Sequence, residues 1–225
     1  MPIAFVSGTE SAFSEAVSSL TISHTVASGA NRILIAAAVT RDSTDSDRPV
    51  TGVTFNATEV FTVAKAQILD ANDITAELWR LVAPTETTAN VVISFTGSVT
   101  QGAYGVTSNY TGVDQSTPID ATGGAGTTSD SPSTADIITT TTNCMLVDAI
   151  YNKANGGITK AATQTLIHSA IGGSVVDGGG SSYRLVTTAT TYSMQWTYTT
   201  TAEAWVMAII ALKDVAAFRP QVMMF

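Results

Sequence analysis

Apolar and polar residues alternate along much of the chain, which is the pattern of half-buried β-strands. In residues 20–26, Leu20, Ile22, His24 and Val26 share one face, while threonine and serine occupy the other. Similar segments follow, and Gly, Asn, Asp or Pro separate most of them: residues 50–55, 60–69, 76–82, 91–95 and 103–110. No segment shows sustained helical spacing of apolar residues. Short strands with short links predict a mainly antiparallel sandwich or barrel.

Two runs are apolar without alternation, residues 33–39 and residues 204–212. The first is typical of a strand that is covered on both faces or lies at the centre of a sandwich. Neither run approaches the roughly 18 apolar residues of a membrane span, so no transmembrane segment is predicted.

Two glycine-rich stretches, residues 121–132 and 171–180, consist mostly of small residues and are predicted to be long surface loops. The strand pattern is the same on both sides of each stretch. We therefore predict a single antiparallel β-sandwich over residues 1–214, of jelly-roll or immunoglobulin-like type. Two domains joined near residues 115–133 are the alternative, and no internal repeat is recognised by inspection.

Composition agrees with a folded all-β protein and excludes some partners. Of the 225 residues, 44% are hydrophobic, 12% are charged and 37 are threonine, whose β-branched side chain suits extended backbone. The formal net charge is −8, and Lys and Arg do not cluster. Nucleic acid and anionic membrane surfaces are not expected as partners, because both attract clustered positive charge.

The residue types that carry most enzyme chemistry are sparse. Cys144 is the single cysteine, which excludes an intramolecular disulfide, and we interpret it as a small buried residue. His24 and His168 are too few for a three-histidine metal site, and both lie in segments typical of core or edge strands. Neither a Gly-x-Ser-x-Gly nucleophile motif nor a phosphate-binding loop is present. We predict no catalytic residue and no enzymatic activity, with glycoside hydrolase or lyase the least favoured class.

Three carboxylates within six residues, Asp42, Asp45 and Asp47, form the densest acidic group. Calcium takes carboxylate and backbone carbonyl ligands, so this segment is a candidate Ca²⁺ site. It lacks the spacing and the glycine of an EF-hand loop, and the flanking Arg41 and Arg48 can neutralise the same acids. A solvated, internally paired loop without a metal is the favoured interpretation, and no other cofactor is predicted.

Two glutamates precede tryptophans by two positions, Glu77 before Trp79 and Glu203 before Trp205. Residues two apart in a strand share a face, so we expect each pair on one face, with the acid reaching solvent at a sheet edge. The alternative is that Trp79 and Trp205 form an exposed aromatic platform that binds a glycan.

The strand pattern ends after residue 214, and residues 215–225 form an apolar C-terminal arm. Its large apolar residues are Phe218, Val222, Met223, Met224 and Phe225. An uncovered segment of this kind would expose a sticky surface. We expect it either to pack on a neighbouring subunit or to fold back on its own domain. At the other terminus no basic region precedes the first apolar residues, which predicts no cleavable secretory signal.

Several segments resemble a β-sandwich module of bacteriophage virion proteins and bacterial surface proteins: residues 19–35, 48–55, 78–84, 110–119 and 204–213. The resemblance implies a fold and a setting but no active-site residue. It implies a non-enzymatic virion protein of the capsid decoration, cement, tail or fibre type. Such a protein would assemble in the host cytoplasm as a homo-oligomer or with other virion proteins. The alternative is a carbohydrate-binding or adhesin-like module, with or without calcium.

Overall fold

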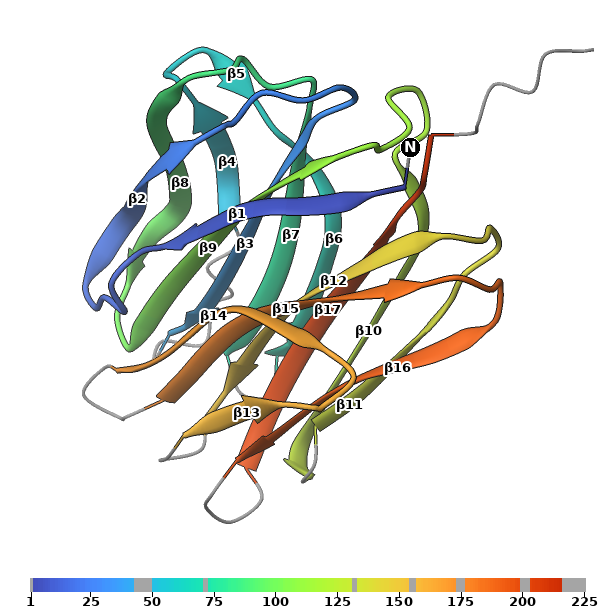
Figure 1. Ribbon diagram of the computed structural model, residues 1–225. Coiled ribbons are helices and arrows are strands. Elements are labelled where there is room, and N and C mark those ends of the chain that lie inside the picture. Colours follow the sequence, from blue (N-terminus) through green and yellow to red (C-terminus); the bar gives the residue numbers. More distant parts are fainter. Residues whose placement is uncertain are drawn as a thin grey trace, which may run out of the picture.

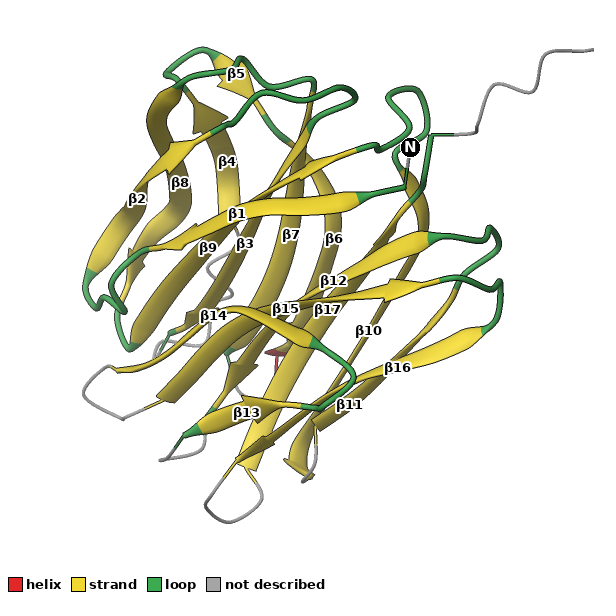
Figure 2. Ribbon diagram, in the orientation of Figure 1, coloured by secondary structure: helices red, strands yellow, loops and turns green. Residues whose placement is uncertain are grey.

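The computed structural model describes residues 2–42, 50–70, 73–130, 133–153, 157–172, 177–198 and 203–215. Within these residues the chain forms seventeen β-strands and no α-helix, and the paired strands are antiparallel (Figure 2). The predicted all-β antiparallel sandwich is thereby confirmed. Some residues with predicted roles lie outside the described part: Asp45, Asp47, Phe218, Val222, Met223, Met224 and Phe225.

The first half of the chain forms two sheets, which together make the first sandwich. Its inner sheet has the strand order β1-β9-β3-β7-β6, and its outer sheet has the order β2-β8-β4-β5. The strands are β1 Ala4–Glu10, β2 Val17–Thr25, β3 Ile33–Arg41, β4 Val50–Phe55, β5 Glu59–Val60, β6 Thr62–Leu69, β7 Ile74–Val82, β8 Thr88–Val99 and β9 Gly102–Thr111.

The second half forms another inner and outer sheet, which make the second sandwich. The inner order is β10-β17-β12-β15-β14, and the outer order is β11-β16-β13. The strands are β10 Ile119–Asp130, β11 Ser133–Ile138, β12 Cys144–Asn152, β13 Ile158–Lys160, β14 Thr165–Gly172, β15 Asp177–Val186, β16 Thr191–Tyr198 and β17 Glu203–Leu212.

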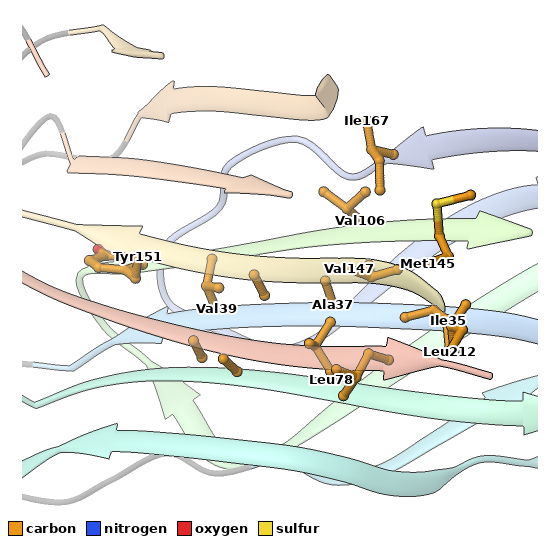
Figure 3. Packing of buried hydrophobic residues seen from close by; sticks show 14 of the residues in the cluster. Ile35, Ala37, Val39, Leu78, Val106, Met145, Val147, Tyr151, Ile167 and Leu212 are labelled. Carbon is orange, nitrogen blue, oxygen red and sulfur yellow. The ribbon is translucent and has the colours of Figure 1, made fainter. Parts of the chain in front are cut away.

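The four sheets stack as four layers, with the two inner sheets facing each other in the middle (Figure 1). Each sandwich has an outer core between its own sheets, which contains Ile93 in the first sandwich and Ile150 in the second. A third core lies between the inner sheets, where Ile35, Val106 and Val147 pack together (Figure 3). We call this interface between the two inner sheets the seam.

The two sandwiches have the same topology. Apart from the two-residue β5, their strands correspond one to one in chain order, from β1 with β10 to β9 with β17. Numbered within each sandwich, the order is 1-8-3-6-5 in the inner sheet and 2-7-4 in the outer sheet. This is a jelly-roll arrangement in which the fifth strand lies in the inner sheet. The predicted single sandwich is therefore corrected to two, joined by residues 112–118, close to the alternative boundary at residues 115–133.

Local details repeat along with the topology. Asn31 and Asn143 precede the equivalent strands β3 and β12, and both have left-handed backbone, with φ of 57° and 58°. The register of β6 shifts just after Val63, and that of the equivalent β14 shifts just after Leu166. Bulges at matching positions show that the two edge strands are equivalent residue by residue.

The stacking explains the uninterrupted apolar runs. An inner sheet is covered by its outer sheet on one side and by the other inner sheet across the seam. The residues of β3 up to Thr40 and those of β17 after Glu203 are accordingly buried on both faces. The prediction of a doubly covered strand over residues 33–39 is confirmed.

The two predicted glycine-rich loops are largely strands. Residues 119–130 form β10, and residues 177–180 begin β15. In both strands glycine leaves room for close packing, because a Cβ at Gly123 would lie 2.3 Å from the carbonyl oxygen of Asp136. A Cβ at Gly179 or Gly180 would lie 2.7 Å from a ring that packs on β15. These rings are Tyr104 from the first sandwich and Trp196 from the second.

The link between the sandwiches is pinned by hydrogen bonds. Asp114 Oδ1 accepts the N–H groups of Ser116 and Thr117 at 2.9 and 3.0 Å. The Nζ of Lys213, just after β17, lies 3.5 Å from Asp114 Oδ2. The N–H of Val215, the last described residue, donates to the carbonyl oxygen of Gly112 at 3.0 Å. The start and the end of the second sandwich are therefore fixed at one point.

Candidate functional site

Only one residue of the candidate calcium segment can be placed. Asp42 is buried just after β3, and its Oδ1 accepts a hydrogen bond from the hydroxyl of Thr100. Its backbone N–H donates to the carbonyl oxygen of Asp73 at 3.1 Å. In the described part of the chain, no three His, Cys, Asp or Glu side chains gather to hold a metal ion. Asp42 therefore contributes to the local backbone structure there.

The two tryptophans of the candidate glycan platform lie in different sandwiches. Trp79 is half-buried against the first outer core, while Trp205 is only 2% exposed within the second. Trp205 cannot stack on a sugar at the surface, so the predicted platform of Trp79 and Trp205 is wrong. Its ring lies inside because β17 has the second outer sheet on that face.

Glu77 and Trp79 share one face of β7, as predicted, but the carboxylate does not reach solvent. Burial raises the pKa of Glu77, and its oxygens are used internally. Oε1 accepts the N–H of Val50 at 2.8 Å, and Oε2 accepts the indole N–H of Trp79 at 2.9 Å. The acid thus ties the inner sheet to β4 of the outer sheet.

The second sandwich holds its own buried carboxylate, Asp148 of β12. Its Oδ2 accepts the indole N–H of Trp196 at 2.8 Å and the amide of Gln164 at 3.2 Å. Its Oδ1 accepts the N–H of Ser182 at 2.6 Å. Complete burial raises the pKa of Asp148 to about 7 despite these donors. Sequence reasoning missed this residue, although an acid inside the apolar run of residues 144–151 is a visible signal.

His24 and Cys144 are core residues, in agreement with the sequence interpretation. His24 Nδ1 lies 2.7 Å from the hydroxyl of Thr9 and 2.9 Å from that of Thr107. Burial lowers the pKa of His24 to about 4, so the imidazole is neutral at physiological pH. The Cys144 thiol is buried in the second outer core. Neither side chain is placed for catalysis.

A buried ion pair joins the two sandwiches across the seam. Arg41 Nη1, at the end of β3, lies 2.8 Å from Asp177 Oδ2, at the start of β15. The hydroxyl of Tyr151 donates to the same oxygen at 2.6 Å. Burial raises the pKa of Asp177, while the hydrogen bonds from Arg41 and Tyr151 act in the opposite direction. This cluster holds the seam together from both sides.

A second polar cluster crosses the seam at its edge. His168 of β14 places Nδ1 at 3.3 Å from Glu10 Oε1 of β1, and Tyr104 donates its hydroxyl to Glu10 Oε2. The ring of Phe13 packs beside Tyr104, with 6.0 Å between centroids, and fills the space above Gly172. His168 is therefore an edge histidine in a half-exposed contact with Glu10, as the sequence suggested.

Several exposed large apolar residues lie on or beside the two equivalent edge strands, while Val6, Ile138 and Leu185 are exposed on other strands. The outer sheets have fewer long strands than the inner sheets, and the outer faces of β6 and β14 are only partly covered. On the first sandwich Val60, Val63 and Ile68 are 66%, 51% and 37% exposed. On the second, Leu166 and Ile171 are 44% and 43% exposed. We call these groups the β6 ledge and the β14 ledge.

The outward orientation of both ledges follows from their strand partners. Val63 lies opposite Trp79, which packs against the first outer core. Leu166 lies opposite Ser182, whose hydroxyl contacts Asp148. Exposed apolar patches of this kind are typical of interaction surfaces. Sequence reasoning did not find them, because alternation alone does not show which strand lacks a covering sheet.

No protein family, curated protein or solved structure matches this chain. In the described ranges no helix has the length and apolar character needed to cross a lipid bilayer.

Proposed function

We propose that this protein is a non-enzymatic structural subunit of a phage particle, and that it assembles through the apolar segment of residues 216–225. The observation that carries the proposal is the contrast between this segment and the body it follows. The body covers most of its large apolar side chains in three cores. The segment adds five more large apolar residues directly after the last fixed strand.

The internal chemistry favours a structural role. The carboxylates of Glu77 and Asp148 each accept an indole N–H and a backbone N–H, and both are buried. A general acid or base needs access to its substrate. These two acids instead hold sheets together, which suits a rigid subunit rather than an enzyme.

The attachment point of the segment also suits assembly. The hydrogen bond from Val215 to Gly112 and the bridge between Asp214 and Val113 fix the chain where residues 216–225 begin. A segment that leaves from a fixed point loses less conformational entropy on docking than one that leaves from a long flexible linker.

Assembly is tested by the mass in solution, measured by light scattering, of the full chain and of a chain that ends at Val215. We expect a discrete oligomer for the full chain and a folded monomer for the shortened one. Equal masses for the two chains would contradict assembly through this segment. Circular dichroism checks that the shortened chain keeps its β-structure.

The phage setting rests on the sequence resemblance and needs its own test. Particles purified by density gradient from cells that make the protein are digested with trypsin and analysed by mass spectrometry. Peptides of this chain should be present at a fixed ratio to the major shell protein. Peptides found only in the particle-free fraction would contradict the virion setting.

A further inference from the structure

We propose that residues 216–225 of one copy dock on the β6 ledge of a neighbouring copy. The inference rests on the proposed function, because it names the surface that the assembling segment would contact. Its occupant is thus a second copy of this chain, bound through the ten residues that follow Val215.

The β6 ledge is an uncovered strip on an edge strand. Among the described strands β6 pairs only with β7 in its sheet, so one side of its backbone has no described strand partner there. Val63 lies opposite Trp79 and Ile68 lies opposite Thr75. Opposite residues on one face of an antiparallel pair have Cβ atoms about 5 Å apart. The ledge therefore offers apolar side chains, an indole ring and an open edge to an extended segment.

The β14 ledge is the poorer site of the two. Its exposed residues lie opposite Ser182 and Gly178, which add little apolar surface. No residue on it corresponds to the exposed Val60 of β5, because the second outer sheet has no equivalent of that strand in the described residues. The equivalent strand thus provides a natural comparison site with the same bulge and no indole ring opposite its exposed residues.

The charges of Glu59 and Lys65 lie off the apolar face of the β6 ledge. The segment carries one charged side chain, Arg219. Glu59 borders the ledge beside Val60, and its Oε1 accepts the N–H of Thr85 at 3.0 Å. The basic Lys65 lies opposite Leu78, which packs in the seam, so it is on the other face of the sheet. The other carboxylate oxygen of Glu59 is buried, so Arg219 would meet neither this acid nor the Lys65 amine on the ledge face.

Chain direction favours a neighbouring copy over the segment's own ledge. β17 ends at the same end of the stack at which β6 begins, since residue 212 is linked through Met145 and the seam to the residues near Val82. To run along its own β6, the segment would have to reverse direction. Ten residues extend about 33 Å at most, which is enough to bridge to an adjacent subunit.

The first experiment compares two double variants of the full chain by light scattering. Val63→Thr with Ile68→Thr removes the apolar surface of the β6 ledge, and Leu166→Thr with Ile171→Thr does the same on β14. All four positions are exposed and threonine suits a strand, so both variants should fold. We expect self-association about 100-fold weaker for the β6 variant, from two lost side-chain burials, and unchanged for the β14 variant.

A second experiment measures docking directly. A synthetic peptide of residues 216–225 is titrated into the chain that ends at Val215, and tryptophan emission is recorded. Trp79 is the half-buried tryptophan, whereas Trp196 and Trp205 are buried, so a saturable emission change should report the β6 ledge. The change should vanish in Trp79→Phe and in the β6 double variant.

The outcomes separate this inference from the proposed function. If truncation at Val215 abolishes the oligomer but the β6 variant keeps it, the segment assembles the protein on another surface, and the inference is wrong. Loss of the oligomer in the β14 variant alone would also overturn it. If truncation leaves the mass unchanged, the proposed function itself fails. Peptide binding to a full chain that is monomeric would indicate docking on its own ledge and overturn the neighbour assignment.

Discussion

The two sandwiches share a strand order but place their buried polar groups differently. The outer core of the first contains Glu77, bound by two donors near a half-buried tryptophan, together with the neutral His24. The outer core of the second is built around Asp148, which is fully buried and bound by Trp196, Ser182 and Gln164. Topology is thus repeated while the internal chemistry differs. The comparison shows that one sheet order can be held together by different polar networks.

The largest difference should appear when each carboxylate is removed. Asp148→Ala leaves the indole N–H of Trp196 and the backbone N–H of Ser182 without acceptors in the interior, while the Gln164 amide keeps the Ser182 hydroxyl oxygen. We expect a loss of about 3–5 kcal/mol in the free energy of unfolding. Glu77→Ala leaves two donors without their acceptor, and one of them is the indole N–H of a partly exposed ring. We expect it to lower the free energy of unfolding by about 2–3 kcal/mol. Urea unfolding at pH 7 measures both. Equal losses would contradict the difference between the two networks.

The two outer cores should also respond oppositely to pH. Asp148 has its pKa raised from 3.8 to about 7, so the folded state holds a proton that the unfolded state releases between these values. Its contribution to stability is greatest below pH 4 and falls as pH rises to 7, by on the order of 4 kcal/mol. His24 has its pKa lowered from 6.5 to about 4, so its contribution is full above pH 6.5 and falls as pH drops to 4.

Variants separate these two opposing slopes. Asp148→Asn should remove the loss of stability between pH 4 and 7, and His24→Leu should remove the loss between pH 6.5 and 4. Each variant is compared with the parent chain by urea unfolding across pH 4–8. A difference from the parent that stays constant across this range would show that the residue does not titrate as described.

A smaller contrast lies within the seam. Arg41→Met leaves Asp177 buried with Tyr151 as its remaining donor, and we expect a loss of about 2–3 kcal/mol. His168→Gln breaks the half-exposed pair with Glu10 and should cost less than about 1 kcal/mol. Thermal unfolding in low and high salt gives both values. An Arg41→Met chain as stable as the parent would show that this ion pair does not secure the seam.

A smaller effect than that of Arg41→Met is expected in the glycine strand β15. Gly179→Ala would place a Cβ 2.7 Å from the Tyr104 ring and 3.1 Å from Val39, which we expect to cost about 1–2 kcal/mol. Gly52→Ala in β4 is the control, because its Cβ would meet nothing within 4 Å. Replacing Tyr104 with Leu in the Gly179→Ala chain should recover part of the loss. If the free energy of unfolding does not recover, the loss in the Gly179→Ala chain does not come from contact with the Tyr104 ring.

Much of the fold follows from the sequence, because alternation and β-branched composition predict strands well. The doubled sandwich does not, since its repeat lies in strand order and bulge position rather than in identical residues. Residues 62–68 and 165–171 begin with threonine and end with isoleucine but otherwise share little. The glycines of β10 and β15 suggested loops because their role, leaving room for aromatic rings and backbone from other strands, depends on distant packing.

The candidate site was less predictable still. Asp42 is buried and Trp79 is half-buried, and the burial of Trp205 depends on a covering sheet that no local pattern reveals. The ledges follow from the unequal widths of paired sheets. The width of a sheet is the number of strands in it, and this depends on which strands pair over long sequence distances. Short sequence segments do not predict this pairing.

The chain order of the sandwiches has a consequence for synthesis on the ribosome. Each sandwich closes when its first strand pairs with its last, β1 with β9 and β10 with β17. The first can therefore close once about half of the chain has emerged, while its seam face, with Ile35 and Val106, still lacks a cover. At about 5–20 residues per second, the second sandwich is roughly 5–20 seconds behind. During that interval the nascent chain carries a sheet-sized apolar face, which makes it a substrate for chaperones and for premature pairing with other nascent copies.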